Sequence, residues 1–304
     1  MADRDPAELN PLNTDGGFTP ATAGLSPMTA PTAQCNSKSY KLPVEDLDFL
    51  LRDEMRAVRF ELEYSKAELM LRDWGVRSTV IVFGSARVPS PEQADEMRRA
   101  ARTAKEKKAA ERRARQAAWY EEARAFGRIV SLRGGALSVR EGVRDNVVAT
   151  GGGPGIMEAA NRGASDVGAP SIGFNITLPM EQKPNCFSTP ELTFRFHYFG
   201  MRKMHLAMRA NALAVFPGGF GTMDELFELL TLQQTGKAPP APIVLVGRDY
   251  WTRVVNFDAF VEEHMIEAAD LKLFEIVDTA EEAWESMVRR GLKAHSPPEK
   301  AQAD

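Results

Sequence analysis

Six short apolar runs constrain the fold of this chain most, because their apolar residues are consecutive rather than alternating. The runs cover residues 79–84, 146–151, 171–176, 213–217, 242–247 and 273–278. Consecutive apolar residues are typical of strands that helices cover on both faces. Segments of helical length separate the runs, with apolar spacing such as Met223, Leu226, Phe227 and Leu230. This alternation predicts an α/β fold with a doubly wound parallel sheet and right-handed crossovers.

The sequence predicts one domain between two tails. Residues 1–40 and 295–304 are rich in Pro, Ala and polar residues and lack apolar periodicity. They cannot bury enough surface to offset their ordering entropy, so we predict disordered tails. Residues 41–294 remain, which is enough for a single α/β domain with an N-terminal helical extension. We predict that extension as one amphipathic helix over residues 46–72.

Residues 92–116 form a charged helical insertion before the second apolar run. From residue 93 to residue 116 the insertion holds nine basic and four acidic residues. A stretch of this kind is either a nucleic-acid-binding helix or a solvated extension of the following helix. No aromatic residue is interleaved with the basic ones until Trp119, and the basic residues do not form one stripe, so the pattern favours the solvated helix.

Composition excludes several classes of protein. Lys and Arg number 38 against 42 Asp and Glu, for a net charge of −4, which gives no global attraction to nucleic acid or acidic membranes. The two cysteines, Cys35 and Cys186, make no disulfide framework and favour a reducing compartment. No apolar run reaches the ~18–20 residues of a membrane span, and the N-terminus has no apolar signal segment. We therefore expect a cytoplasmic protein with neither nucleic-acid nor membrane partners.

Three glycine-containing loops follow apolar runs, at residues 83–87, 151–158 and 217–225. Small residues let a ligand approach the backbone, and the free N–H groups of a following helix bind anions. The spacing matches neither the dinucleotide fingerprint nor the P-loop. For residues 151–158 a tight turn with close helix packing is the alternative interpretation. In the third loop, three glycines in four positions expose amides, and Thr222 adds a hydroxyl donor.

Two charged groups near the third loop are open to a structural interpretation as well as a functional one. Thr222 and Glu225 have the spacing of a capping box, in which the Glu carboxylate bonds the start of its own helix. Arg202 and Lys203 could be the solvated terminus of a helix. Against capping alone, acidic residues beside an anion site are costly unless a substrate uses one of them.

The residues of this region together resemble a known family. Arg202-Lys203, followed by Pro-Gly-Gly-Phe-Gly-Thr at 217–222 and by Glu225, is similar to the LOG family. LOG proteins are nucleoside 5′-monophosphate phosphoribohydrolases that activate cytokinins, long labelled lysine decarboxylases. The separation of 23 residues between Arg202 and Glu225 is as in that family. The stretches 151–161 and 231–237 resemble its longer bacterial branch, and the resemblance covers about 75–294.

The resemblance implies a Rossmann-like fold and a hydrolase. The expected reaction cleaves the N-glycosidic bond of a purine nucleoside 5′-monophosphate (AMP and/or a cytokinin riboside 5′-monophosphate) to free base and ribose 5-phosphate. Arg202 and Glu225 match the catalytic pair. From the glycine loops and the matching family positions, we expect the substrate to contact Ser85, Gly152, Gly153, Glu181, Lys203, Gly218, Gly219, Phe220, Gly221, Thr222, Met223, Asp224 and Thr231. No metal or cofactor is implied, and the resemblance implies a homo-oligomer, a dimer or higher, with the site near the interface.

The sequence departs from the family pattern in three places. Asn211 stands where many members have Asp, three extra residues separate Glu181 from Arg202, and residues 92–116 are an insertion. None of these touches the Arg202–Glu225 pair. The alternative function is a non-enzymatic Rossmann-like protein that binds a nucleotide or molybdenum cofactor. A further alternative, the historical label, is a decarboxylase that uses pyridoxal phosphate.

Overall fold

The computed structural model describes residues 32–139, 142–178 and 183–293, in two compact units, Met1–Val58 and Arg59–Asp304. The first unit holds short helical pieces: η3 (Lys38–Tyr40), η4 (Pro43–Glu45), α1 (Leu47–Leu50) and η5 (Asp53–Met55). The prediction of one helix over residues 46–72 was therefore wrong, because a separate helix, α2, covers only Arg56–Asp73. No residue of α1 or η5 is buried, so no tertiary packing holds that stretch in one helix. Most of the two predicted tails lies outside the described residues.

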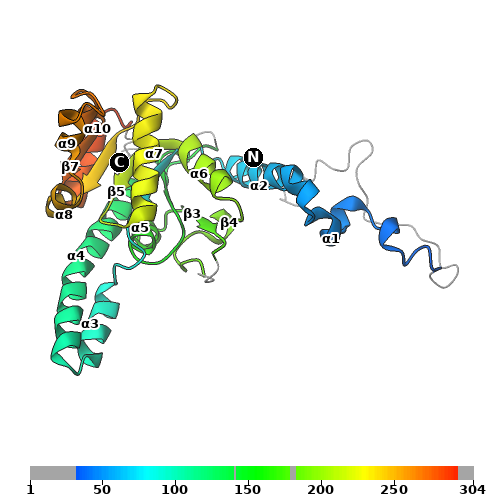
Figure 1. Ribbon diagram of the computed structural model, residues 1–304, viewed down its shortest axis with the longest axis horizontal. Helices are drawn as coiled ribbons and strands as arrows, with labels where there is room; N and C mark the ends of the chain where they lie inside the picture. Colours follow the sequence, from blue (N-terminus) through cyan, green and yellow to red (C-terminus); the bar gives the residue numbers. More distant parts are fainter. Residues whose placement is uncertain (1–31, 140–141, 179–182, 294–304) are drawn as a thin grey trace, which may run out of the picture. The chain divides into compact units, whose positions relative to one another are not determined.

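The second unit is built on a seven-stranded parallel sheet with the strand order β4-β3-β2-β1-β5-β6-β7 (Figure 1). The predicted doubly wound parallel sheet is confirmed. β4 was missed because it alternates, with Phe194 and Phe196 buried and Arg195 exposed, as an edge strand does. The strands are β1 (Thr79–Phe83), β2 (Val147–Thr150), β3 (Ser171–Ile176), β4 (Thr193–Phe196), β5 (Ala210–Val215), β6 (Ile243–Val246) and β7 (Phe274–Val277).

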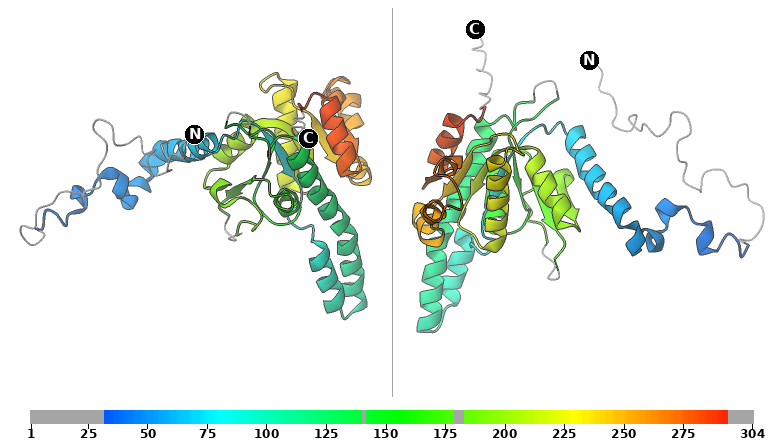
Figure 2. Two further views of the ribbon diagram at one scale, coloured as in Figure 1. Left: turned by 180° about the vertical axis from the view of Figure 1, so that it is seen from behind. Right: turned by 45° about the horizontal axis from the view of Figure 1, so that its top comes forward.

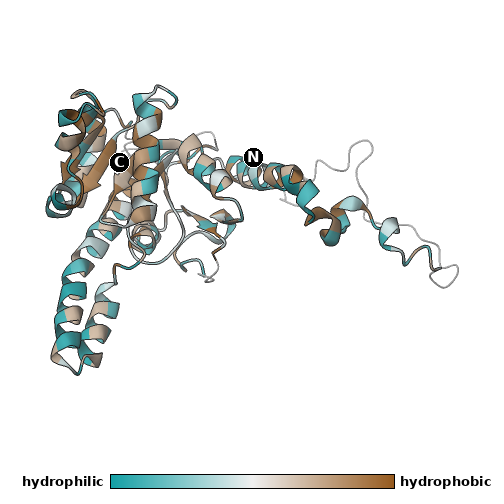
Figure 3. Cartoon of the chain, viewed as in Figure 1, coloured by the Kyte–Doolittle hydropathy of each residue, from teal (hydrophilic) through white to brown (hydrophobic). Residues whose placement is uncertain are grey.

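Helices cover both faces of the sheet. Val80 and Val82 of β1 pack with α4, α5 and α10 on one face, and Ile81 and Phe83 pack with α2, α6, α7 and α8 on the other. This two-sided burial explains the consecutive apolar residues, which form the brown strands of Figure 3. No helix of the described residues has both the length and the apolar character needed to cross a membrane. Besides α2, the helices are α3 (Pro91–Ala100), α4 (Ala104–Arg133), α5 (Ile156–Ser165), α6 (Phe199–Met208), α7 (Phe220–Gln234), α8 (Arg248–Val254), α9 (Phe257–Glu262) and α10 (Ala280–Arg289), with η6 (Pro190–Leu192) and η7 (Asp270–Leu273).

The winding of the chain reverses between β1 and β5. The strands β1 to β4 follow one another outward, and β5 then returns to pair with the other edge of β1, with Phe83 opposite Val215. The loops that leave β1 and β5 therefore depart toward opposite faces of the sheet. In open α/β sheets the crevice between two such loops is where ligands bind.

The charged insertion forms a hairpin of two helices, α3 and α4, that projects from the sheet in both Figure 1 and Figure 2. We expected a single helical stretch. Each helix instead begins with its own capping box, Ser90 with Gln93 and Thr103 with Glu106. The second capping box separates α4 from α3, because the Glu106 carboxylate accepts hydrogen bonds from the backbone N–H groups of Arg102 and Thr103.

Two glycines bring α4 into backbone contact with α5. A Cβ on Gly127 would lie 2.2 Å from the carbonyl oxygen of Ala160, and a Cβ on Gly163 would lie 2.0 Å from that of Arg124. The long helix of the hairpin therefore fixes the position of α5. Since α5 begins directly after the second glycine loop, this contact also positions that loop.

We expect Gly127→Ala to destabilise the protein although alanine favours helices. The added methyl group meets backbone that cannot move aside, which costs about 1–3 kcal/mol of the free energy of unfolding. Gly200→Ala is the matched control, because a Cβ on Gly200 of α6 meets no atom within 4 Å. That variant should be neutral or gain up to about 1 kcal/mol. Urea unfolding measures both, and equal stabilities would contradict the contact.

Candidate active site

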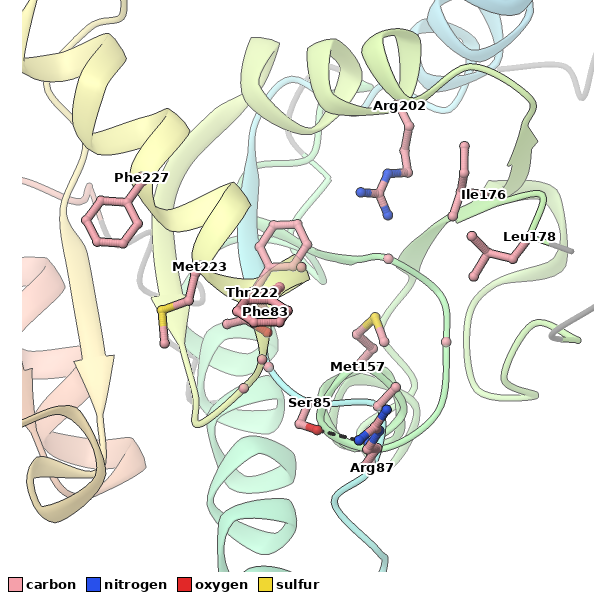
Figure 4. Close-up of a pocket in the computed structure, with 18 of the residues that line it drawn as sticks. Phe83, Ser85, Arg87, Met157, Ile176, Leu178, Arg202, Thr222, Met223 and Phe227 are labelled. Atoms are coloured by element: carbon pink, nitrogen blue, oxygen red, sulfur yellow. Dashed lines mark hydrogen bonds between the residues drawn. The ribbon is translucent and has the colours of Figure 1, made fainter. Parts of the chain in front are cut away.

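A cavity of about 850 Å³ lies at the reversal, beyond the carboxyl ends of β1 and β5 (Figure 4). Its walls come from the three glycine loops, the end of β3, the start of α6 and the end of α8. A volume of this size suits a small organic ligand. The lining includes Phe83, Ser85, Arg87, Gly151, Gly153, Met157, Asn175, Ile176, Leu178, Phe199, Arg202, Gly218–Met223, Phe227, Tyr250, Val254 and Val255.

Ser85 ties the three loops together through its backbone. Its N–H donates to the carbonyl of Pro217 at 3.0 Å, and its own carbonyl accepts from Ile156 at 3.2 Å. Gly155 has a φ of +71°, and a Cβ there would lie 2.4 Å from the Ser85 carbonyl oxygen. The close-packing interpretation of residues 151–158 therefore holds for Gly155, whereas Gly151 and Gly153 line the cavity.

Gly152 supports the second loop from behind. Its φ is +69°, and its carbonyl accepts from the side chain of Asn175 at 3.1 Å and from the N–H of Asn185 at 2.9 Å. A Cβ at this position would lie 2.1 Å from the Asn175 side-chain oxygen. Gly152 is thus placed to hold the loop against β3 rather than to face the cavity.

The third loop leads into α7 earlier than the capping pattern suggested. Gly219 is the N-cap, and its carbonyl accepts from Thr222 and Met223, each at 3.0 Å. The capping-box interpretation of Thr222 and Glu225 was therefore wrong, since both residues lie inside the helix. Gly218 is held by the Tyr250 hydroxyl, which donates to its carbonyl oxygen. A Cβ on Gly219 would meet no atom within 4 Å, so its backbone is open.

Arg202 and Glu225 form a buried ion pair between α6 and α7. Nη2 of Arg202 lies 2.6 Å from Oε1 of Glu225, and the side chains are only 12% and 4% exposed. Because Arg202 lies within α6 and is largely buried, its interpretation as a solvated helix terminus was wrong. A Cβ on Gly151 would lie 3.7 Å from its Nη1, and the guanidinium stands 5.5 Å from the Phe199 ring. Arg202 thus lines the cavity, with Glu225 beside it.

Burial sets the protonation of Glu225. Loss of solvent raises the pKa of this carboxyl to about 7, although the charges of Arg202 and Lys203 act to lower it. Asp224 and Glu228 raise it further. Nε of Arg202 is also buried and has no hydrogen-bond partner among the described residues. A carboxylate with a pKa near neutrality is suited to accept or donate a proton at physiological pH.

The predicted site residues fall into four groups. Gly152 and Glu225 are not among the lining residues, although Glu225 is paired with Arg202, which does line the cavity. Lys203, Asp224 and Thr231 line a shallower groove of about 480 Å³ beside the cavity, where Lys203 pairs with Asp224 at 2.7 Å. Glu181 falls outside the residues that the structure describes. The predicted residues that do line the main cavity are Ser85, Gly153, Arg202, Gly218, Gly219, Phe220, Gly221, Thr222 and Met223.

Apart from Arg202, sequence reasoning missed the lining residues that belong to no glycine loop. Asn175 lies near the carboxyl end of β3 and Tyr250 follows β6, so their places at the carboxyl ends of parallel strands were the available signal. Asn211, where the sequence departs from the family, lies near the start of β5 and bonds Asn146 at 2.8 Å. That end of the strand is opposite the cavity, so this departure leaves the site unchanged.

Comparison with known proteins finds a matching family model, related sequences and similar solved structures. A family model described as "possible lysine decarboxylase" matches residues 157–287. The chain is 30% identical over 141 residues to a probable cytokinin riboside 5′-monophosphate phosphoribohydrolase of Oryza sativa subsp. japonica, covering 45% of this chain and 60% of that protein. It is 28% identical over 141 residues to a cytokinin riboside 5′-monophosphate phosphoribohydrolase of Arabidopsis thaliana, covering 45% and 64%. Among solved structures, a molybdenum cofactor binding protein from Rippkaea orientalis gives a TM-score of 0.42 at 17% identity, covering 70% of this chain and 95% of that one.

The parallel sheet, with glycine loops at its reversal, defines a Rossmann-like α/β protein, as predicted. Arg202 and Glu225 both lie within the segment that the family model matches. These sequence matches make the chain similar to proteins of the LOG family. The match spans less than two thirds of the length of either plant relative.

We expect the raised pKa of Glu225 to make stability depend on pH. Folding raises this pKa from 4.5 to about 7. Stability contributed by such a group is complete below the unfolded pKa and is lost as pH rises through the folded one. From about pH 5.5 to about pH 8.5, wild type should lose about 2 kcal/mol of unfolding free energy relative to Glu225→Gln. Urea unfolding of both proteins at both pH values measures this difference, and parallel pH dependences would contradict the raised pKa.

Proposed function

We propose that this protein hydrolyses the N-glycosidic bond of purine nucleoside 5′-monophosphates, AMP and/or cytokinin riboside 5′-monophosphates, releasing the free base and ribose 5-phosphate. The observation that carries the proposal is the buried Arg202–Glu225 pair beside a cavity whose lining includes the three glycine loops. The names of the plant relatives describe the same reaction class.

In this proposal Glu225 acts on the sugar carbon and on water. Cleavage of the bond between C1′ and the base leaves positive charge on the ribose, which a neighbouring carboxylate stabilises. The oxygen of a water molecule then bonds C1′ and one proton of that water passes to Glu225. The departing base takes up a proton from solvent, and Glu225 returns its own proton to solvent, so that one water molecule is consumed overall. Arg202 holds the carboxylate in place at 2.6 Å and keeps part of it ionised despite burial.

The loops supply the other two recognition elements. Backbone amides at the starts of α5 and α7, with the Thr222 hydroxyl, are suited to the 5′-phosphate. The apolar and aromatic part of the lining, including Phe83, Met157 and Phe227, is suited to a flat purine. A pyridoxal phosphate decarboxylase would need a lysine for its aldimine, and no described residue that lines the cavity is a lysine.

Incubation of the purified protein with AMP tests the proposal directly. Chromatography should show adenine and ribose 5-phosphate appearing together in equal amounts. A nucleotide that stays bound without being cleaved would instead support the alternative, a binding protein without activity.

The proposal includes a homo-oligomer in the cytoplasm. Phe220 is 96% exposed and Phe199 is 53% exposed at the rim of the cavity, and large apolar side chains grouped on a surface mark an interaction site. Light scattering of the purified protein measures the assembly, and a monomer would contradict this part of the proposal.

We expect Glu225→Gln to reduce turnover of AMP by about 10²–10⁴-fold, the range of an electrostatic or general-base contribution. The amide keeps the shape of the side chain and removes its charge. Steady-state adenine release measures the effect. Glu285→Gln, which changes an exposed carboxylate on α10, is the matched control and should match wild type. Near-normal turnover in Glu225→Gln would reject the catalytic role.

We also expect adenosine to be cleaved at least ~100-fold less efficiently than AMP, because the phosphate supplies binding energy that positions C1′. Several charge-assisted bonds from amides are sufficient for this difference. The ratio of kcat/KM for the two substrates measures it. Equal efficiencies would reject the assignment of the loops to the phosphate, and with it the substrate class.

A further inference from the structure

Arg87 is a cavity-lining cation that neither the reaction scheme nor the predicted site has used. It ends the first glycine loop, immediately after Gly84, Ser85 and Ala86, and its side chain lines the cavity. Figure 4 shows it beside Ser85 and Met157, at the end of the cavity away from Arg202. The start of α5, which Ile156 and Met157 form, lies at the same end.

The backbone of Arg87 is held on both sides while its side chain stays accessible. Its N–H donates to the Ser85 hydroxyl at 3.1 Å, and Ser85 is itself bonded to Pro217 and Ile156. The next residue, Val88, is only 4% exposed and packs in the core. Arg87 therefore projects from a fixed point between two anchors.

The charge of the cavity wall leaves Arg87 available for a ligand. Among the described residues that line the cavity, Arg87 and Arg202 are the only charged ones, so the lining carries positive charge without a carboxylate. Arg202 is already paired with Glu225. Arg87 makes no ion pair with another described residue.

We propose that Arg87 binds the 5′-phosphate of the substrate and determines the preference for nucleotide over nucleoside. The inference rests on the proposed function and adds a side chain to the backbone donors of the loops. A guanidinium offers two parallel N–H donors that match two phosphate oxygens. With the phosphate held by Arg87 and the start of α5, the ribose extends toward Arg202 and Glu225 at the other end of the cavity.

The test compares Arg87→Gln and Arg87→Lys with wild type and with Arg99→Gln, an exposed arginine on α3 outside the cavity lining. Removing one charge-assisted contact should lower kcat/KM for AMP about 10- to 100-fold in Arg87→Gln and leave adenosine within about twofold. The kcat/KM of Arg87→Lys for AMP should lie between those of wild type and Arg87→Gln, because lysine keeps the positive charge but lacks the two parallel N–H donors of a guanidinium. Arg99→Gln should match wild type.

Calorimetry with ribose 5-phosphate gives a second readout that needs no turnover. Wild type and Arg99→Gln should bind it, and Arg87→Gln should bind it about 10- to 100-fold more weakly. Circular dichroism confirms that the variants fold. If wild type cleaves no AMP but its ribose 5-phosphate affinity depends on Arg87, the proposed function fails and the phosphate contact stands. Equal affinity in wild type and Arg87→Gln, or no binding to wild type, would overturn the proposal.

Discussion

The reversal of winding between β1 and β5 is the constraint on which the rest of the site depends. Because β5 pairs with the edge of β1 that β2 leaves free, the loops after these two strands lead to helices on opposite faces of the sheet. A crevice therefore opens between the two loops, at the carboxyl ends of the strands. The backbone of Ser85 is hydrogen-bonded to Pro217 of the third glycine loop and to Ile156, which follows the second. This close contact leaves room for glycine alone at position 155. The glycines of the motif therefore serve two purposes, since some permit close backbone contact and others leave the cavity open.

The Arg202–Glu225 pair is better explained by chemistry than by stability. Burying two charges has a desolvation cost that their attraction only partly offsets, so such a pair is weak support for a fold. The raised pKa of Glu225 shows this cost directly, because it persists beside a guanidinium at 2.6 Å. Two helices that pack on the same face of the sheet, α6 and α7, hold the pair. A costly arrangement held by rigid elements would suit the catalytic role proposed for Glu225.

The sequence was sufficient to predict the sheet, because two-sided burial leaves a local pattern in each strand. It was not sufficient for β4, whose exposed Arg195 interrupts that pattern.

The sequence pattern of a capping box predicted a helix start in one case and not in another. Thr103 with Glu106 is a real capping box that divided the insertion, whereas Thr222 with Glu225 has the same spacing inside a helix. Only the position of the helix start separates the two cases, and tertiary contacts decide that position. For the same reason Tyr250, which supports Gly218 from α8, left no motif to recognise.

The cavity and the groove beside it also differ in how their charges are balanced. In the groove, Lys203 is held by both Asp224 and Glu228, so its charge is neutralised within the protein. In the cavity the lining cations outnumber the lining carboxylates, and the one carboxylate close to them, Glu225, is buried beside Arg202. A surplus of positive charge on a concave wall attracts an anion. An anionic ligand would also favour the protonated form of Glu225, since added negative charge raises the pKa of a carboxyl. Substrate binding and the protonation of the proposed base are therefore coupled through the same field, with Arg202 between them.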